Sequence, residues 1–349
     1  MKTREKAIVL SAWIDSASCI TLVSHARPDG DAAGSCAAAA AYLRGCRGKD
    51  VAVILPDAVP ASLGFVLDGC NLTVACDAPA AAAARLASTD LLICLDFNTM
   101  SRAEGIAEKL QSCRARKVLV DHHEGPSTDE FDLCFSSTAV SSACELLYTV
   151  LLEMPDIAHD ASRLPMQAAR ALMTGMTTDT NNFANSVYPG TLRMASELLA
   201  AGVDRDDLID RIYFSERPNR LAAQGDFLTS YMEILPCGAA VTVLPQSFFE
   251  RHGLADGETE GFVNMPLAVK DVRLSILARE DEGRFRVSLR SKRGVSARSL
   301  AVRCFHGGGH EQASGGKILI PDDIPDTSAA AEYLREVAAR FMQENNTVN

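Results

Sequence analysis

The chain has 349 residues, a hydrophobic content of 47% and a formal net charge of −11. This length exceeds that of one ordinary hydrophobic core and predicts two domains, and the composition excludes an intrinsically disordered chain. The sequence lacks an apolar run of about 18 residues, so we expect no transmembrane helix and no membrane partner. An acidic protein is also poorly suited to long duplex DNA, because phosphate binding depends on Lys and Arg.

The cysteines and the N-terminus bear on the compartment. The eleven cysteines show neither disulfide-type clustering nor a C-x-x-C pair. The N-terminal apolar run is short and Asp15 interrupts it, so we expect no signal peptide. Free thiols without an export signal predict a reducing, cytoplasmic location.

The first half of the chain alternates between helical patterns and short, unbroken apolar runs. A helix is predicted over residues 5–19, and a strand that ends at Val23 follows it. The later predicted strands cover 51–55, 90–95 and 117–120, and the predicted helices cover 32–44, 78–87, 101–113, 140–152 and 164–175. This alternation predicts an α/β domain with a parallel sheet and helices on both faces.

The second half has a different pattern. Helices are predicted over 190–199, 206–214, 220–233 and 328–342, and alternating strands over 239–244, 272–278, 284–289 and 317–320. The strands predict a smaller α+β domain with a mostly antiparallel sheet. We expect a first domain over 1–203, a helical linker over 204–222 and a second domain over 223–349.

One imidazole and two carboxylates follow the first strand, in the stretch SHARPDGDAAGS. These are His25, Asp29 and Asp31, and an alanine-rich helix begins beside them. Carboxylates and imidazole suit a divalent ion such as Mn²⁺ or Mg²⁺, and the absence of Cys argues against structural zinc. Aspartates before a helix are also common N-caps. On this stretch alone, the two interpretations are equally open.

Further polar residues follow the later strands. Asp96 follows the strand over 90–95, Asp121-His122-His123 follows the next one, and Asp179 is expected in a polar loop. The carboxyl ends of parallel strands share one edge of a sheet, so we expect these groups to converge there. Several carboxylates at one edge repel one another unless cations neutralise them. Two metal ions would do so, and would suit hydrolysis of phosphate esters.

A glycine run, GGGHEQASGG, covers residues 307–316. It lies in a segment from Arg273 to Lys317 that is rich in Lys and Arg inside an otherwise acidic chain. Glycines let backbone N–H groups approach an anion closely, and His310 adds an imidazole. The alternative is a flexible turn beside a solvated strand face; the basic context favours anion binding.

Together these blocks resemble the DHH phosphoesterase family, in the branch that carries a DHHA1 domain at its C-terminal side. The matching blocks are HARPDGDAAGS, Asp96, DHH at 121–123, GMTTDTNNF around Asp179 and GGGHEQASGG, so the resemblance spans about residues 20–320. The two-domain length resembles the oligoribonuclease and pAp-phosphatase (nanoRNase) type. The resemblance implies a DHH domain, a DHHA1 domain and an active-site cleft between them.

The resemblance also implies roles for matching residues. The expected ligands of one Mn²⁺ are His25, Asp29 and Asp96. The expected ligands of a second are Asp31, Asp96, His122 and Asp179, with Asp96 bridging both ions. Asp121 would orient the histidines, and His123 would lie near the scissile phosphate as a proton donor or charge stabiliser. The residues expected to bind substrate are Asn264, Arg290, Gly307, Gly308, Gly309 and His310.

The implied activity is hydrolysis of short oligonucleotides to mononucleotides, dephosphorylation of pAp, or both. It would use two divalent ions, Mn²⁺ first, with Mg²⁺ or Co²⁺ as alternatives. Cyclic-dinucleotide phosphodiesterase and exopolyphosphatase-like activities are alternatives within the same fold, and a nucleotide-binding module without hydrolysis is an alternative outside it. The expected partners are short oligonucleotides or nucleotide phosphates; a homodimer is left open.

Overall fold

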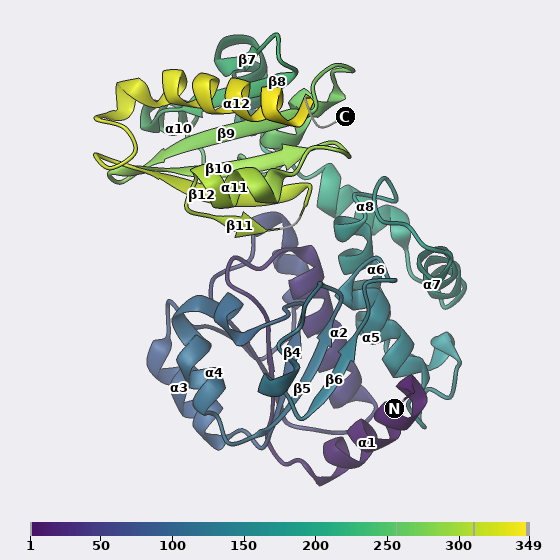
Figure 1. Ribbon diagram of the computed structural model, residues 1–349. Coiled ribbons are helices and arrows are strands. Elements are labelled where there is room, and N and C mark those ends of the chain that lie inside the picture. The colour runs from purple at the N-terminus through teal and green to yellow at the C-terminus, as the bar shows by residue number, and fades with distance from the viewer. Residues whose placement is uncertain (1, 256, 310, 347–349) are drawn as a thin grey trace. The chain divides into compact units, whose positions relative to one another are not determined.

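The structure, a computed structural model, describes residues 2–255, 257–309 and 311–346 (Figure 1). The chain divides into two compact units, Met1–Ser215 and Glu216–Asn349. This division falls within residues 204–222, and the separate linker there stays a prediction. Over the described part of the chain, none of the helices is long and apolar enough to cross a membrane.

The first unit is built on a six-stranded parallel sheet of order β3-β2-β1-β4-β5-β6, which confirms the predicted parallel sheet. Its strands are β1 (Ile20–Val23), β2 (Val51–Leu55), β3 (Leu72–Val74), β4 (Leu91–Leu95), β5 (Arg116–Asp121) and β6 (Leu133–Ser136). The central strands β1, β2 and β4 are buried along their whole length, as their unbroken apolar sequences predict.

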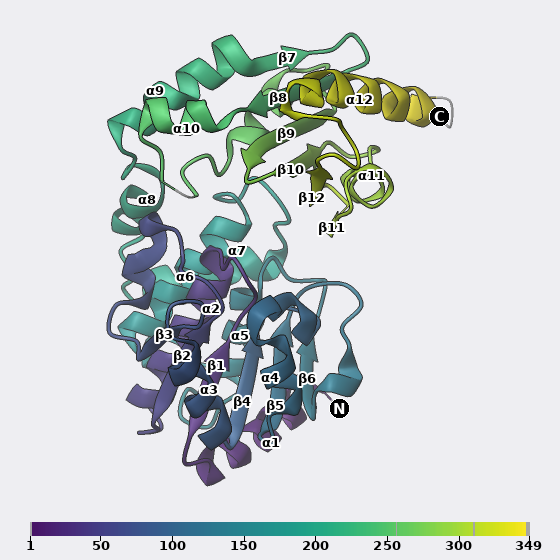
Figure 2. The same ribbon diagram turned by 90° about the vertical axis from the view of Figure 1, so that its left-hand side faces the viewer.

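Helices cover both faces of this sheet (Figures 1 and 2). The helices are α1 (Thr3–Ser16), α2 (Gly30–Gly45), α3 (Pro79–Ser88), α4 (Ala107–Ser112), α5 (Ala143–Leu152), α6 (Met166–Asp179), α7 (Pro189–Ala200) and α8 (Arg205–Tyr213). Side chains of β4 alternate between the two cores: Ile93 joins the one beneath α2 and α5, and Cys94 joins the one beneath α3 and α4. The sheet is therefore a buried middle layer.

Short 3₁₀ helices complete the unit: η1 (Ala61–Leu67), η2 (Met100–Ile106), η3 (Thr128–Glu130) and η4 (Ala161–Arg163). Two predictions need correction here. The helix predicted over 101–113 is η2 followed by α4, because Glu104 has a φ of 40° that interrupts the helix. The polar loop expected around Asp179 is the last turn of α6, which ends at Asp179.

The second unit holds a six-stranded sheet of order β11-β12-β10-β9-β8-β7, in which the β8–β9 pair is parallel and the other four pairs are antiparallel. Its strands are β7 (Met232–Ile234), β8 (Ala239–Leu244), β9 (Leu274–Asp281), β10 (Arg284–Ser291), β11 (Gly308–Gly309) and β12 (Ala313–Leu319). Its helices are α9 (Pro218–Asp226), π-helical η5 (Phe227–Tyr231), α10 (Gln246–His252), η6 (Phe262–Ala268), α11 (Ala297–Cys304), η7 (Thr327–Ala329) and α12 (Ala330–Asn346). The predicted α+β fold with a mostly antiparallel sheet is confirmed. The helix predicted over 220–233 is α9 continued by η5, and it ends at Tyr231, directly before β7.

This second sheet also has a core on each face. Ile276 of β9 packs with residues of α11 and α12, and its neighbour Leu277 packs with residues of α9, α10 and η6. The period-two alternation of β9 thus places apolar side chains on both faces, whereas the apolar side chains of β10 all face the core beneath α11 and α12. The glycine run forms β11 and the start of β12 at one edge of the sheet.

Candidate metal centre

The loop between β1 and α2 holds the first group of polar side chains. Asp29 is the N-cap of α2: its Oδ1 accepts hydrogen bonds from the backbone N–H groups of Asp31 (3.0 Å) and Ala32 (3.1 Å). The same Oδ1 lies 3.9 Å from Nε2 of buried His25. Asp29 therefore caps the helix and also faces the imidazole, so the two interpretations of this loop are compatible.

Asp96 lies at the centre of the cluster. It directly follows β4, has a φ of 63°, and its N–H donates to the carbonyl of Val120 (3.0 Å) at the end of the neighbouring strand β5. Its Oδ2 is 3.4 Å from His25 Nε2, and its Oδ1 is 3.5 Å from His122 Nε2. Oδ1 is buried and has no hydrogen-bond partner among the described residues. A buried carboxylate oxygen without a donor is costly, and a cation would satisfy it.

Asp31 is held by the N-terminus of α5. Its side chain is buried, and its two carboxylate oxygens accept from the N–H groups of Ala143 (2.6 Å) and Cys144 (2.9 Å). These are first-turn amides without partners inside the helix, and the helix dipole favours a negative charge there. Ser142 caps this helix by accepting from the N–H of Glu145 (3.0 Å). The sequence SSACE therefore builds the amide pair that receives Asp31.

Close packing of α6 on α2 brings Asp179 to the same place. A Cβ on Gly34 would lie 2.7 Å from the carbonyl oxygen of Ala171, and one on Gly30 would lie 2.3 Å from Thr178 Oγ1. Only glycine permits this approach of the two helices. The Asp179 carboxylate consequently lies 3.5 Å from His122 Nε2, which is also 3.9 Å from Asp31.

The sequence-predicted metal ligands thus come together. Among the described residues, three groups place one candidate ligand atom per residue within 4.8 Å of each other. The groups are His25/Asp29/Asp96, Asp31/His122/Asp179 and Asp96/His122/His123. Oxygen and imidazole donors without thiolates suit Mn²⁺ and related divalent ions. Together with the unpartnered Asp96 oxygen, the donor set fits metal binding.

The electrostatics of these groups are strongly coupled. Burial acts against charge on both imidazoles, but the Asp96 carboxylate outweighs it and raises the pKa of His25 to about 9 and of His122 to about 10. Burial raises the pKa of Asp179 to about 7, with Asp96 and Asp29 adding repulsion. Burial, followed by repulsion from Asp96 and Asp179, also raises the pKa of Asp31. Such crowding of carboxylates is relieved by cations.

Asp121 contacts one of the two histidines that it was expected to orient. Its buried carboxylate accepts from the backbone N–H of His123 (3.1 Å) and lies 2.6 Å from His123 Nδ1. On the other side of that ring, Nη1 of Arg102 lies 2.9 Å from His123 Nε2. Sequence reasoning missed Arg102, because it lies on η2, in a stretch where we expected a continuous helix.

The predicted substrate residues lie in the second unit. Arg290 of β10 pairs with Ala313 of β12, and Gly309 pairs with Ser314, so Arg290 and the glycine run share one end of this sheet. Arg290 is half-buried, and burial lowers the pKa of its guanidinium. Asn264 is exposed on η6. His310 lies outside the described residues.

Packing explains most of the glycines in the run. A Cβ on Gly307 would lie 1.9 Å from the carbonyl oxygen of Gly315, and one on Gly309, which has a φ of 139°, would lie 2.7 Å from that of Ala313. Gly308 is exposed, and a Cβ at that position would meet nothing within 4 Å. The pairing of β11 with β12 therefore requires Gly307 and Gly309, while packing leaves Gly308 unexplained.

The basic segment carries less free charge than its sequence suggests. Arg284 and Arg286 both pair with Asp281 (3.1 and 2.8 Å), and Arg303 pairs with Glu344 (2.7 Å). Surface pairs of this kind contribute little stability, but they reduce the local positive charge.

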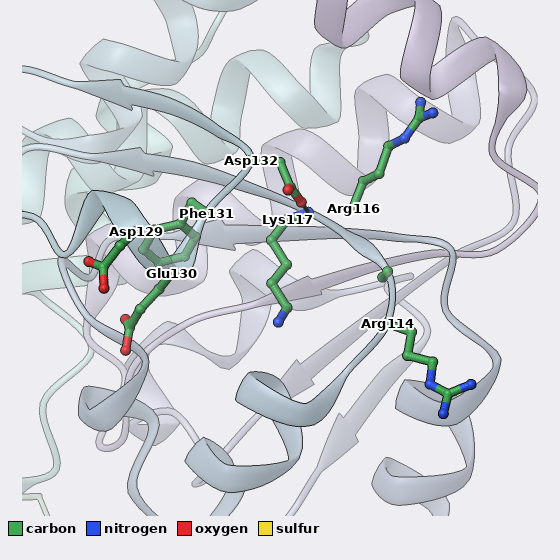
Figure 3. A pocket seen from close by; sticks show the side chains of 8 residues that line it. Arg114, Arg116, Lys117, Asp129, Glu130, Phe131 and Asp132 are labelled. Carbon is green, nitrogen blue, oxygen red and sulfur yellow. Dashed lines mark hydrogen bonds between the residues drawn. The ribbon is translucent and has the colours of Figure 1, made fainter.

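A hollow of about 380 Å³ lies away from these groups (Figure 3). Its lining residues are Arg114, Ala115, Arg116, Lys117, Asp129, Glu130, Phe131 and Asp132. They surround the start of β5 and the residues before β6, which is the amino edge of the sheet, opposite the polar cluster. Cations and carboxylates are mixed there, and it contains none of the predicted ligands.

Comparison with known proteins agrees with the blocks in the sequence. Residues 19–176 match the N-terminal domain of the DHH family, and residues 238–336 match the DHHA1 domain. The bifunctional oligoribonuclease and PAP phosphatase NrnA of Bacillus subtilis is 27% identical over 236 residues, which cover 66% of this chain and 72% of that protein. NrnA of Thermus thermophilus is 33% identical over 177 residues, covering 50% of this chain and 52% of that protein.

A solved structure extends the likeness to both units. The crystal structure of an exopolyphosphatase-related protein from Bacteroides fragilis matches with a TM-score of 0.90 and 29% identity, and the match covers 98% of each chain. The chain therefore belongs to the DHH family, carries a DHHA1 domain and is a hydrolase, with a cluster of side chains that fits a metal ion.

Proposed function

We propose that the protein is a Mn²⁺-dependent phosphoesterase that hydrolyses short oligoribonucleotides to mononucleotides, dephosphorylates pAp, or does both. The observation that carries the proposal is the buried Oδ1 of Asp96, which has no hydrogen-bond partner among the described residues and belongs to a side chain shared by two of the three donor groups. The likeness to NrnA supports this choice of substrates. The mixed carboxylate and imidazole donors support Mn²⁺, and leave Mg²⁺ or Co²⁺ as alternatives.

In this proposal one ion is held by His25, Asp29 and Asp96. A second is held by Asp31, Asp96, His122 and Asp179, with Asp96 bridging. Two divalent ions in such a site supply an activated water and neutralise charge on the phosphate. The chain keeps the ligands in place through the α5 amides on Asp31 and the capping role of Asp29. Asp121 fixes the His123 ring.

The second unit would bind the substrate's phosphate. Arg290 and the exposed backbone of Gly308 are its proposed contacts, with Asn264, Gly307, Gly309 and His310. A short substrate is consistent with the net charge of −11, because a local site need not follow a long polyanionic backbone. The eleven free cysteines support a cytoplasmic location within the same proposal.

One observation favours a second candidate. The protein from Bacteroides fragilis, whose structure matches this chain over both units, is named exopolyphosphatase-related. Inorganic polyphosphate offers the same non-bridging phosphate oxygens and negative charge without a base to recognise. Cyclic and linear dinucleotides are further alternatives with the same phosphate chemistry.

A substrate panel tests the proposal. The EDTA-treated protein, with and without added Mn²⁺, is assayed on a 5′-phosphorylated diribonucleotide, pAp, the matching deoxydinucleotide, a cyclic dinucleotide and polyphosphate at equal concentration. We expect Mn²⁺-dependent turnover that is fastest on the diribonucleotide or pAp. Asp96→Ala serves as the inactive control. Preference for polyphosphate would select the second candidate, and undiminished turnover by Asp96→Ala would exclude the proposed centre.

A further inference from the structure

Arg102 lies beside the candidate metal centre on a turn held at several points. The backbone N–H of Ala26, next to His25, donates to the carbonyl of Arg102 (2.8 Å). Glu130 accepts from the N–H of Met100 (2.8 Å), which begins η2. Glu104 accepts from the Arg27 guanidinium (2.7 and 3.3 Å). The turn is therefore fixed to the β1–α2 loop, and the position of Arg102 is set by the backbone.

The hydrogen bonds of His123 define what Arg102 contacts. A carboxylate only accepts hydrogen bonds, so the 2.6 Å contact with Asp121 places a proton on His123 Nδ1. A guanidinium only donates hydrogen bonds, so the 2.9 Å contact with Nη1 of Arg102 places a lone pair on the other ring nitrogen, Nε2. A proton on Nε2 would oppose the guanidinium N–H. In this arrangement His123 is an acceptor for Arg102 and offers no Nε2 proton to a leaving group.

The charge of Arg102 is not compensated by an acidic side chain. Over the described part of the chain, no carboxylate lies within ion-pair distance of its guanidinium, although its neighbour His123 is 3.8 Å from Asp96. A guanidinium has five N–H donors, and the bond to His123 uses one of them. Arg102 is only half-buried, so the remaining donors are available to an anion. Guanidinium forks match the oxygens of phosphate closely.

We propose that Arg102 is a catalytic residue that binds non-bridging oxygens of the phosphate at the metal centre, with His123 as the positioning residue that anchors its guanidinium. The inference rests on the proposed phosphoesterase function. It assigns the stabilisation of transition-state charge to Arg102, and it makes His123 an anchor in place of a proton donor. Such a cation acts on the oxygens where charge develops during phosphoryl transfer.

The first test compares Arg102→Ala and Arg102→Lys with Arg114→Ala, an exposed arginine at the opposite edge of the sheet (Figure 3). We expect Arg102→Ala to lower kcat/KM with Mn²⁺ by about a hundredfold or more. Arg102→Lys should recover only part of the loss, because an ammonium lacks the fork. Added guanidinium should restore activity to Arg102→Ala, and Mn²⁺ affinity and melting temperature should stay near the wild-type values.

Two results would overturn the proposal. One is wild-type kcat/KM in folded, Mn²⁺-loaded Arg102→Ala. The other is an activity loss that is explained by lost Mn²⁺ binding or lost folding. In that case Arg102→Lys and Arg102→Ala would lose activity alike, and added guanidinium would not restore it. A double-mutant cycle adds a check on the anchor: if Arg102 and His123 act as a unit, Arg102→Ala/His123→Ala should be about as slow as the slower single variant, whereas multiplied losses contradict it.

The failure of the proposed function is recognised separately. If the wild-type protein hydrolyses nothing in the substrate panel, binding of inorganic phosphate to the Mn²⁺-loaded protein still tests Arg102 by calorimetry. Weaker binding by Arg102→Ala than by Arg114→Ala supports the assignment. Equal binding by the two variants refutes it.

Discussion

Gly175 of α6 lies directly against the carboxylate of Asp31 on α2. A Cβ on Gly175 would stand 2.9 Å from Asp31 Oδ1 and 2.3 Å from Cys144 Sγ. Both positions belong to the cluster: Asp31 is a proposed ligand, and Cys144 supplies one of the amides that hold it. The packing of the three helices α2, α5 and α6 and the geometry of the candidate metal centre therefore both depend on the absence of a side chain at Gly175.

Gly175→Ala should reduce stability and weaken Mn²⁺ binding together. Overpacking at a site without free space costs about 1–3 kcal/mol, more than the helix propensity gained from alanine. The displaced group is Asp31, so we also expect a lower Mn²⁺ affinity. Urea unfolding and calorimetry measure the two effects. The control is Gly225→Ala on α9, where nothing lies within 4 Å; it should be neutral or stabilising. Equal behaviour of the two variants would contradict the argument.

Asp96→Asn should abolish tight Mn²⁺ binding at more than one position. Asp96 belongs to two of the three donor groups, and its buried Oδ1 has no hydrogen-bond partner in the described part of the chain. The amide keeps the shape of the side chain but removes its charge. We expect a lower Mn²⁺ stoichiometry by calorimetry and at least a hundredfold lower turnover, beyond the effect typical of residues that only contact ligands. Asp206→Asn, an exposed change in the same unit, should bind Mn²⁺ like the wild type. Unchanged stoichiometry in Asp96→Asn would refute the bridging role.

Most of the first unit could be predicted because its central strands are buried on both faces. The run Val51–Leu55 is apolar throughout, and β2 has those bounds. The edge strands gave weaker patterns: β3 is short and half-exposed, and β11 is a pair of glycines. Their pairing is set by neighbouring strands, which a local pattern does not contain.

The candidate site was predictable where polar residues follow strands, and less so where helices supply them. Asp96 directly follows β4, and Asp121 is the last residue of β5. Their convergence therefore follows from the parallel arrangement of the two strands. Asp179 was misplaced because the polar sequence TTDT is typical of a loop; in the structure Thr174 and Thr177 are buried against neighbouring helices, and the helix continues. The contacts of the α5 amides with Asp31 and of Arg102 with His123 join distant segments, and a single sequence does not show them.

The stability of the metal-free protein should fall as pH rises, and the stabilisation of the fold by Mn²⁺ should increase. The pKa of His25 is raised to about 9 and that of His122 to about 10, so their stabilising contribution is complete below the unfolded value of 6.5 and is lost towards pH 9–10. The pKa of Asp179 is raised to about 7, so its ionisation between about pH 4 and 7 also disfavours the metal-free fold.

Metal binding requires neutral imidazoles and ionised carboxylates, so it releases protons and strengthens over the same range. We expect the increase in melting temperature caused by Mn²⁺ to be larger at about pH 8 than at about pH 6. Thermal unfolding after EDTA treatment, with and without Mn²⁺, measures this at both pH values. Asp96→Asn should show little increase at either. A Mn²⁺ effect that is constant or shrinks with pH would be inconsistent with these ligands.

Asp323 of the second unit anchors the turn that leads into the glycine run. Its carboxylate lies 3.0 and 3.1 Å from Nε2 of His306, the residue before Gly307, and accepts from the N–H of Leu319 at the end of β12 (2.8 Å). His306 has a φ of 48°, a conformation that needs support from its surroundings. The pair thus connects the entry of the glycine run to the far end of its partner strand.

Asp323→Ala should therefore loosen the glycine run and raise KM, if that run binds the substrate's phosphate as proposed. Loss of the hydrogen bonds should cost about 1–3 kcal/mol in the unfolding free energy. The proposed metal ligands belong to the other unit, so kcat and Mn²⁺ affinity should change by less than about twofold, which corresponds to about 0.4 kcal/mol. The neighbouring exposed change Asp322→Ala is the matched control and should leave KM unaltered. A lower kcat with constant KM would place the run outside substrate binding, because uniform binding acts on KM alone.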